Sequence, residues 1–88
     1  EEAVLVDTIK QWLRRHPDYS GRFFDLSALH DDWILTGSEE FSKQFSRTLI
    51  LGRKLWSLQD TLRTIFDVEV KHGSVQKQWS FALKGGEK

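Results

Sequence analysis

The spacing of apolar residues changes once along this chain, and the change limits the folds that are open to it. From Ala3 to about Phe66, apolar side chains recur three and four residues apart, which is typical of amphipathic helices. After Asp67 they alternate with polar side chains, which predicts a two-stranded hairpin between Val68 and Leu83. Helices followed by one C-terminal hairpin indicate the α+β class.

The first half of the chain carries clear signals for helix ends. We expect a first helix over residues 3–15 that ends before Pro17, because the residue before a proline avoids the α region. A very short strand is predicted at residues 22–24. A second helix is expected over roughly residues 26–36. Its N-cap would be Asp25 or Ser27, and Gly37 would be the left-handed residue after its end.

Residues 38–66 are helical in pattern but long for one helix. Two apolar series run through them, the first formed by Phe41, Phe45 and Leu49, the second by Leu51, Leu55, Leu58, Leu62 and Ile65. One unbroken helix fits this pattern. A break near Gly52 fits equally well, because glycine inside a helix costs about 1 kcal/mol relative to alanine. We favour a short helix over residues 39–46, followed by a longer one that ends near Phe66.

Length and composition narrow the class of protein. With 88 residues the chain has room for one small core, and we expect a single domain over residues 1–84 with a polar tail at 85–88. Cysteine is absent, which excludes disulfides and thiolate zinc sites and suits an intracellular protein of the cytoplasm or nucleus. No apolar run approaches the roughly 20 residues that span a bilayer, so no membrane partner is expected.

Charge is divided unevenly between the two halves of a chain whose net charge is zero. Residues 1–40 hold four basic and nine acidic side chains, a net charge of −5, whereas residues 41–88 hold nine basic and four acidic ones, a net charge of +5. Such asymmetry predicts a surface that faces a polyanion. The alternative is that both halves are simply solvated.

Two short segments resemble a known family. Phe24-Asp25-Leu26-Ser27-Ala28-Leu29 resembles the strand-to-helix entry of winged-helix DNA-binding domains, and Leu51-Gly52-Arg53-Lys54-Leu55-Trp56-Ser57-Leu58 precedes the hairpin that would be the wing. Over residues 3–84 the chain is similar to the C-terminal winged-helix domains of phage and plasmid primase-helicases. The resemblance implies three to four helices, a hairpin wing and a short strand between the first two helices. It also implies that the domain belongs to a larger replication or mobile-element protein, whose other domains or subunits would be further partners. The long 38–66 segment departs from the family pattern and leaves open which turn is the recognition helix.

The same resemblance names a set of residues for contact with nucleic acid, with duplex DNA favoured. Arginine reads guanine, glutamine reads adenine and lysine mainly neutralises phosphate. The expected contacts come from the recognition helix (Arg47, Arg53, Lys54, Ser57) and from the wing (Lys71, His72, Ser74, Gln76, Lys77). Two alternatives remain, namely that these charges only aid solubility, or that the domain binds another protein, which zero net charge and the surplus of aromatic residues favour.

Catalysis is not expected. Asp31 and Asp32 are adjacent, so in a helix their side chains point roughly 100° apart and share no face. His16, His30 and His72 are scattered, and no phosphate loop, catalytic triad or zinc pattern is present. We therefore predict a protein that is not an enzyme, with no catalytic residue, no metal and no cofactor.

The chain contains four tryptophans, and their positions in the apolar pattern predict which are buried and which are exposed. Trp33 and Trp79 lie on apolar faces and are predicted to be in the core. Trp12 and Trp56 lie beside the main apolar series, and partial exposure is predicted for both. An exposed Trp56, close in sequence to Arg53 and Lys54, would be an anchor for protein or nucleic acid.

Overall fold

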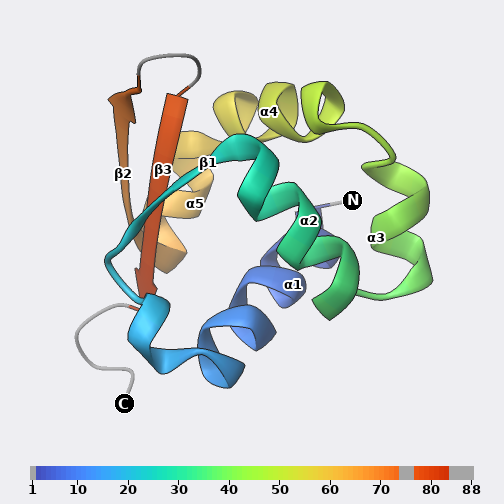
Figure 1. Ribbon diagram of the computed structural model, residues 1–88, viewed down its shortest axis with the longest axis horizontal. Helices are drawn as coiled ribbons and strands as arrows, with labels where there is room; N and C mark the ends of the chain where they lie inside the picture. The colour runs from blue at the N-terminus through green and yellow to red at the C-terminus, as the bar shows by residue number, and fades with distance from the viewer. Residues whose placement is uncertain (1, 74–76, 84–88) are drawn as a thin grey trace.

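The computed structural model describes residues 2–73 and 77–83 and has an α+β fold, in which helices pack on one face of a three-stranded antiparallel sheet (Figure 1). The predicted tail at 85–88 lies outside the described residues. The elements in chain order are α1 (Glu2–Arg15), the 3-10 helix η1 (Pro17–Tyr19), β1 (Phe23–Asp25), α2 (Leu26–Thr36), α3 (Glu39–Gln44), α4 (Thr48–Ser57), α5 (Gln59–Ile65), β2 (Phe66–His72) and β3 (Lys77–Leu83). The first two helices, the short strand and the hairpin lie where the sequence predicts them.

The start of α2 differs from its prediction in one contact. Asp25 occupies the N-cap position, but its side chain makes no capping hydrogen bond. Its Oδ1 instead accepts a hydrogen bond of 2.8 Å from Nε2 of Gln78, a residue of β3. The predicted N-cap position of Asp25 is therefore confirmed, but its carboxylate joins β1 to the neighbouring strand and does not cap the helix.

Gly37 also has a different role from the one predicted. Its φ of −80° and ψ of 177° are extended and not left-handed. A Cβ at this position would lie 2.9 Å from the backbone oxygen of Trp33 and 3.0 Å from Cβ of Phe41. Glycine is needed here because α2 and α3 approach each other too closely for a side chain.

Residues 38–66 form three helices, and none of the breaks falls at Gly52. The chain turns between α3 and α4 at residues 45–47, and again at Leu58, whose φ of −101° and ψ of 9° separate α4 from α5. Gly52 lies inside α4, where a Cβ would approach Cδ2 of Leu26 to 2.6 Å. The glycine thus lets α4 pack closely on the start of α2, and the alternative of a break at this residue is wrong. The favoured short helix is confirmed as α3, whereas the longer helix expected after it is divided into α4 and α5.

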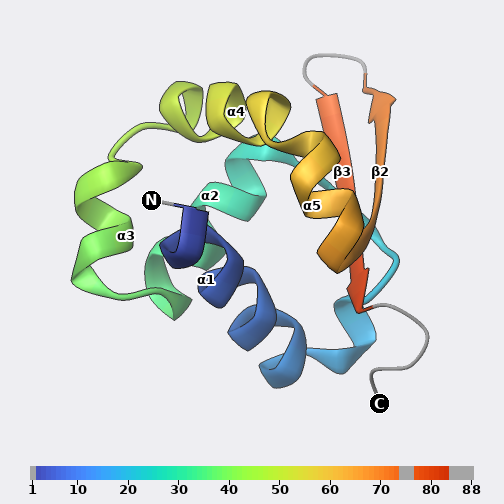
Figure 2. The ribbon, with the colours of Figure 1, turned by 180° about the vertical axis from the view of Figure 1, so that it is seen from behind.

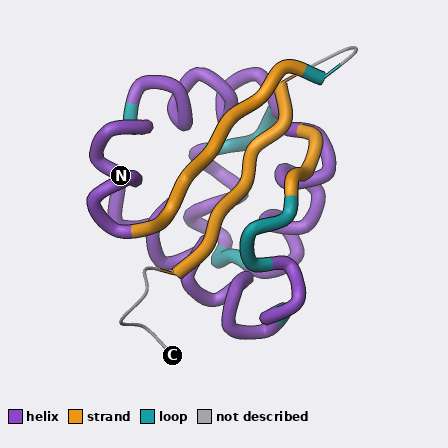
Figure 3. Tube along the Cα trace, turned by 90° about the vertical axis from the view of Figure 1, so that its left-hand side faces the viewer, coloured by secondary structure: helices purple, strands orange, loops and turns teal. Residues whose placement is uncertain are grey.

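The sheet has the order β1-β3-β2, so the last strand is the central one (Figure 3). Phe24 pairs with Trp79, and Val68 pairs with Phe81. Because side chains alternate along a strand, Trp79 and Phe81 face the helices while Gln78 and Ser80 face the opposite way. The sequence predicted the β2–β3 hairpin but did not specify that β1 adds to the free edge of β3.

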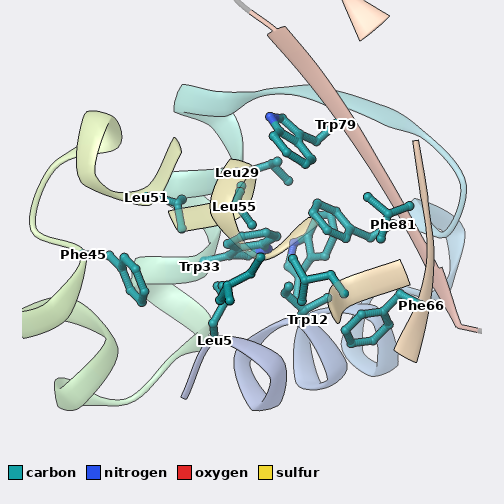
Figure 4. Packing of buried hydrophobic residues seen from close by; sticks show 14 of the residues in the cluster. Leu5, Trp12, Leu29, Trp33, Phe45, Leu51, Leu55, Phe66, Trp79 and Phe81 are labelled. Carbon is teal, nitrogen blue, oxygen red and sulfur yellow. The ribbon is translucent and has the colours of Figure 1, made fainter. Parts of the chain in front are cut away.

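The core is built around aromatic rings from several elements (Figure 4). Trp33 and Trp79 are buried as predicted, but Trp12 is fully buried as well, which corrects the expectation of partial exposure. The rings of Tyr19 and Phe24 cover Trp12, with centroids 5.5 and 5.3 Å from its own. These contacts come from the turn and strand after α1, which the helical pattern of α1 does not reveal.

Substitution of Gly37 tests the close approach of α2 and α3. Because a Cβ would press on backbone, we expect Gly37→Ala to lower the free energy of unfolding by about 1–3 kcal/mol, as overpacking does. Gly37→Asn should cost at least as much, since its side chain is larger. Urea denaturation followed by circular dichroism measures both. A left-handed glycine would give the reverse order, with asparagine tolerated better than alanine.

Candidate nucleic-acid interface

Helix α4 buries one side and leaves the other open. Leu51 and Leu55 face the core. On the opposite side, Leu49 is 62% exposed, Ile50 42% and Trp56 50%. The exposed Arg53 and Ser57 lie among them, since residues three and four apart share a helix face. This exposed side, called the α4 face below, combines large apolar side chains with a cation.

Two hollows flank the α4 face. The first, called the α4–β3 hollow, has a volume of about 420 Å³ and is lined by Leu26, Leu49, Gly52, Arg53, Trp56, Ser57, Lys77 and Trp79. The second, of about 350 Å³, is lined by Gln44, Phe45, Ile50, Arg53, Lys54 and Ser57. Arg53 and Ser57 line both hollows and therefore form the ridge between them.

Trp56 links α4 to the hairpin. Nζ of Lys77, the first residue of β3, lies 3.7 Å from the centre of the Trp56 ring. Trp79 meets the same ring edge to face, with centroids 6.4 Å apart. A cation this close to an indole face is attracted by the ring quadrupole. The predicted partial exposure of Trp56 is confirmed, and the structure explains how the side chain is held.

The structure brings together several of the residues expected from the recognition helix and wing. Arg53, Ser57 and Lys77 line the α4–β3 hollow, and Lys54 lines the second hollow. Arg47 is exposed at the residue before α4. His72 is exposed and pairs directly with Lys77, so the two side chains share a face of the hairpin.

Lys71 is separated from this group. It pairs with Gln78 on the sheet face that points away from the helices. Its Nζ lies 4.5 Å from the ring centre of Phe23 in β1, which is on the same outer face. The structure therefore places Lys71 and Lys77 on opposite faces of the hairpin. The expected contacts Ser74 and Gln76 lie outside the described residues.

The cations around α4 have no acidic partner in the described part of the chain. Within residues 2–73 and 77–83 the one salt bridge joins Arg63 to Asp60, at 3.7 Å. Residues 41–59 contain four basic side chains and no acidic one. The charges of Arg53, Lys54 and Lys77 are therefore open to an anion from outside.

Sequence reasoning identified Trp56 but missed the other apolar residues of this site, Leu49 and Ile50. It assigned Leu49 to the same apolar series as Phe41 and Phe45, which are buried. The turn at residues 45–47 starts a new helix with a different phase, and this turn puts Leu49 in solvent. Leu26 and Gly52 were not singled out as lining residues, because they meet only after α2 and α4 have packed together.

Three of the side chains considered for catalysis, those of His16, His30 and Asp32, have structural contacts. Nε2 of His30 donates to the backbone oxygen of Phe45 at 2.6 Å, and the ring of His16 stacks on Tyr19 with centroids 4.6 Å apart. Oδ2 of Asp32 accepts from Nε1 of the buried Trp12 at 3.4 Å. Among the described residues, no group of three or more histidine, aspartate or glutamate side chains is arranged to hold a metal ion.

None of the described helices has both the length and the apolar character required to cross a membrane, the longest being α1 with 14 residues. In comparisons with known proteins, no family model, no curated protein and no solved structure matches the chain.

Substitution of Trp56 should lower the free energy of unfolding less than substitution of Trp12. Trp56→Ala loses one ring contact and one cation contact at a half-exposed position, so we expect a cost of about 1–2 kcal/mol. Trp12→Ala leaves a cavity in the core and should cost about 3–5 kcal/mol. Urea denaturation measures both values. Equal costs would contradict the assignment of Trp56 to an exposed site.

Proposed function

We propose that this chain is a winged-helix domain that binds nucleic acid, with duplex DNA as the favoured form, through the α4 face and the start of β3. The order of helices and strands supports this fold, as does the β1-β3-β2 sheet with its C-terminal hairpin. In this proposal α4 is the recognition helix and the β2–β3 hairpin is the wing. Figures 1 and 2 support this assignment of recognition helix and wing, since α4 lies beside the end of the hairpin where β3 begins.

One observation carries the proposal: Arg53, Lys54 and Lys77 surround an exposed helix face and have no acidic partner among the described residues. The major groove of DNA is about 12 Å wide and admits an α-helix. With α4 in the groove, Arg53 on the ridge would reach base edges, while Lys54 and Lys77 would neutralise phosphates on either side. Lys71 has no part in this contact, because it lies on the outer face of the sheet.

A protein partner is the second candidate, and the apolar part of the α4 face favours it. Leu49, Ile50 and Trp56 expose more apolar surface than contact with phosphates requires. Exposed apolar residues clustered on one face mark sites of protein contact. Either partner suits a module of a larger replication or mobile-element protein that acts inside the cell, which we retain as part of the proposal.

Neutralising the cations of α4 tests the first candidate. We expect Arg53→Gln/Lys54→Gln to weaken binding to a duplex DNA and to reduce the slope of log K against log salt by about one per lost phosphate contact. Fluorescence anisotropy with a labelled duplex, measured over a range of salt concentrations, gives both quantities. The unfolding curve of the variant should change little, since Arg53 is exposed and Lys54 half-buried.

The matched control is Arg14→Gln/Arg15→Gln. This pair is also adjacent and basic, is exposed at the end of α1, and lies at the opposite end of the molecule from α4 (Figures 1 and 2). It removes the same charge but lies away from the proposed contact, so it should leave the salt slope unchanged. Undetectable binding of DNA at low salt, or binding that does not weaken as salt rises, would overturn the nucleic-acid candidate and leave the protein partner.

A further inference from the structure

The α4–β3 hollow has features that contact with a duplex does not use. Its volume of about 420 Å³ falls in the range of small-molecule sites. Leu26, Leu49 and Trp79 give it apolar walls, and the half-exposed ring of Trp56 adds an aromatic one. Base pairs in a duplex keep their faces stacked inside and offer only edges, sugars and phosphates to a protein. An apolar, partly aromatic hollow therefore has no counterpart on an intact duplex.

An unpaired nucleotide does have the matching chemistry. Its base exposes a flat apolar face that packs on aromatic side chains, and a phosphate follows on each side. Arg53 and Lys77 line the hollow and carry charges with no acidic partner in the described part of the chain. We propose that the α4–β3 hollow binds an unpaired base next to a duplex, with Lys77 on the phosphate of that nucleotide. This inference rests on the proposed nucleic-acid function, in which α4 contacts the duplex, and names the further nucleotide that the site selects.

Lys77 lies beside the aromatic wall of the hollow. Its Nζ is 3.7 Å from the ring centre of Trp56, so the cation and the aromatic surface are neighbours. In a nucleotide the phosphate and the base are also neighbours, joined by one sugar. A phosphate that contacts Lys77 therefore brings its own base to the mouth of the hollow. A basic side chain far from any aromatic ring could bind the phosphate, but it would not place the base on an aromatic surface.

Gly52 keeps the hollow open on the side of α2. Leu26 packs against the backbone of α4 at this position, where a Cβ would lie 2.6 Å from its Cδ2. A larger residue at position 52 would push Leu26 aside or project into the hollow. The same glycine that lets α4 approach α2 thus leaves room beside Trp56.

The test compares three labelled DNAs that share one duplex sequence. The first is blunt, the second carries a short single-stranded overhang, and the third carries an overhang of abasic nucleotides, which has the phosphates without the bases. For the full chain, we expect anisotropy titrations to show the natural overhang bound about ten-fold more tightly than the blunt or the abasic form, within the range of base–aromatic stacking.

Variants of the hollow should remove the preference for the overhang. For Trp56→Ala and Leu49→Ala we expect the ratio of natural-overhang affinity to blunt-duplex affinity, each measured with the same variant, to fall from about ten toward one. Trp56→Phe should keep most of the preference, because a ring remains. Leu35→Ala is the matched control for Leu49→Ala, since Leu35 is 83% exposed on α2 and lines neither hollow.

The possible failures are distinguishable. Equal affinity for natural and abasic overhangs would overturn the inference while leaving the proposed function intact, because only phosphates would then be contacted. Absence of binding to all three DNAs would overturn both. If the overhang gives no gain and an acidic peptide with one aromatic residue binds in a way that Trp56→Ala abolishes, the hollow takes a protein segment and the inference is wrong.

Discussion

The packing of Trp33 is the contact on which the rest of this structure depends. Its ring meets Trp12 of α1, Phe41 of α3 and Phe81 of β3 edge to face, with centroids 5.6, 6.4 and 5.4 Å apart. One side chain of α2 thus fixes three other elements at once. Its indole N–H is buried and has no hydrogen-bond partner among the described residues, which costs about 1–3 kcal/mol. The stabilisation gained from ring packing around Trp33 therefore exceeds the free-energy cost of leaving its indole N–H without a partner.

The candidate site depends indirectly on the packing of Trp33, through α3 and β3. Trp33 packs on Phe41 of α3, the short helix after which the chain turns into α4. Phe81 holds β3, whose next inward residue, Trp79, lines the α4–β3 hollow. The hollow therefore lies where two chain segments anchored by the same ring come together. A site placed in this way is held on rigid elements, which favours precise contact with a ligand.

Local patterns predicted the elements well where one period continues without interruption. The first two helices and the β2–β3 hairpin are of this kind. Prediction was wrong where contacts distant in sequence decide the outcome, as with burial of Trp12 under Tyr19 and Phe24, or the close approach that requires Gly37. The break between α3 and α4 was predicted, but the apolar spacing continues across it from Phe45 to Leu49, so the pattern did not indicate that Leu49 would be exposed. In the candidate site, the resemblance to winged-helix domains predicted Arg53 and Lys77. The hollow between them depends on the packing of α2 on α4, which the spacing of residues does not predict.

The central claim is that nucleic acid binds at the α4 face beside β3, and the four tryptophan indoles provide a direct test of it. In a ¹⁵N-labelled sample each indole N–H gives its own NMR signal, and single substitutions assign them. Addition of a duplex with an overhang should shift the indole signal of the half-exposed Trp56 together with the backbone amides of Arg53, Ser57 and Lys77. The signals of the buried Trp12 and Trp33 should stay in place. Shifts confined to α1 or to the outer face of the sheet, or no shifts at all, would contradict the account.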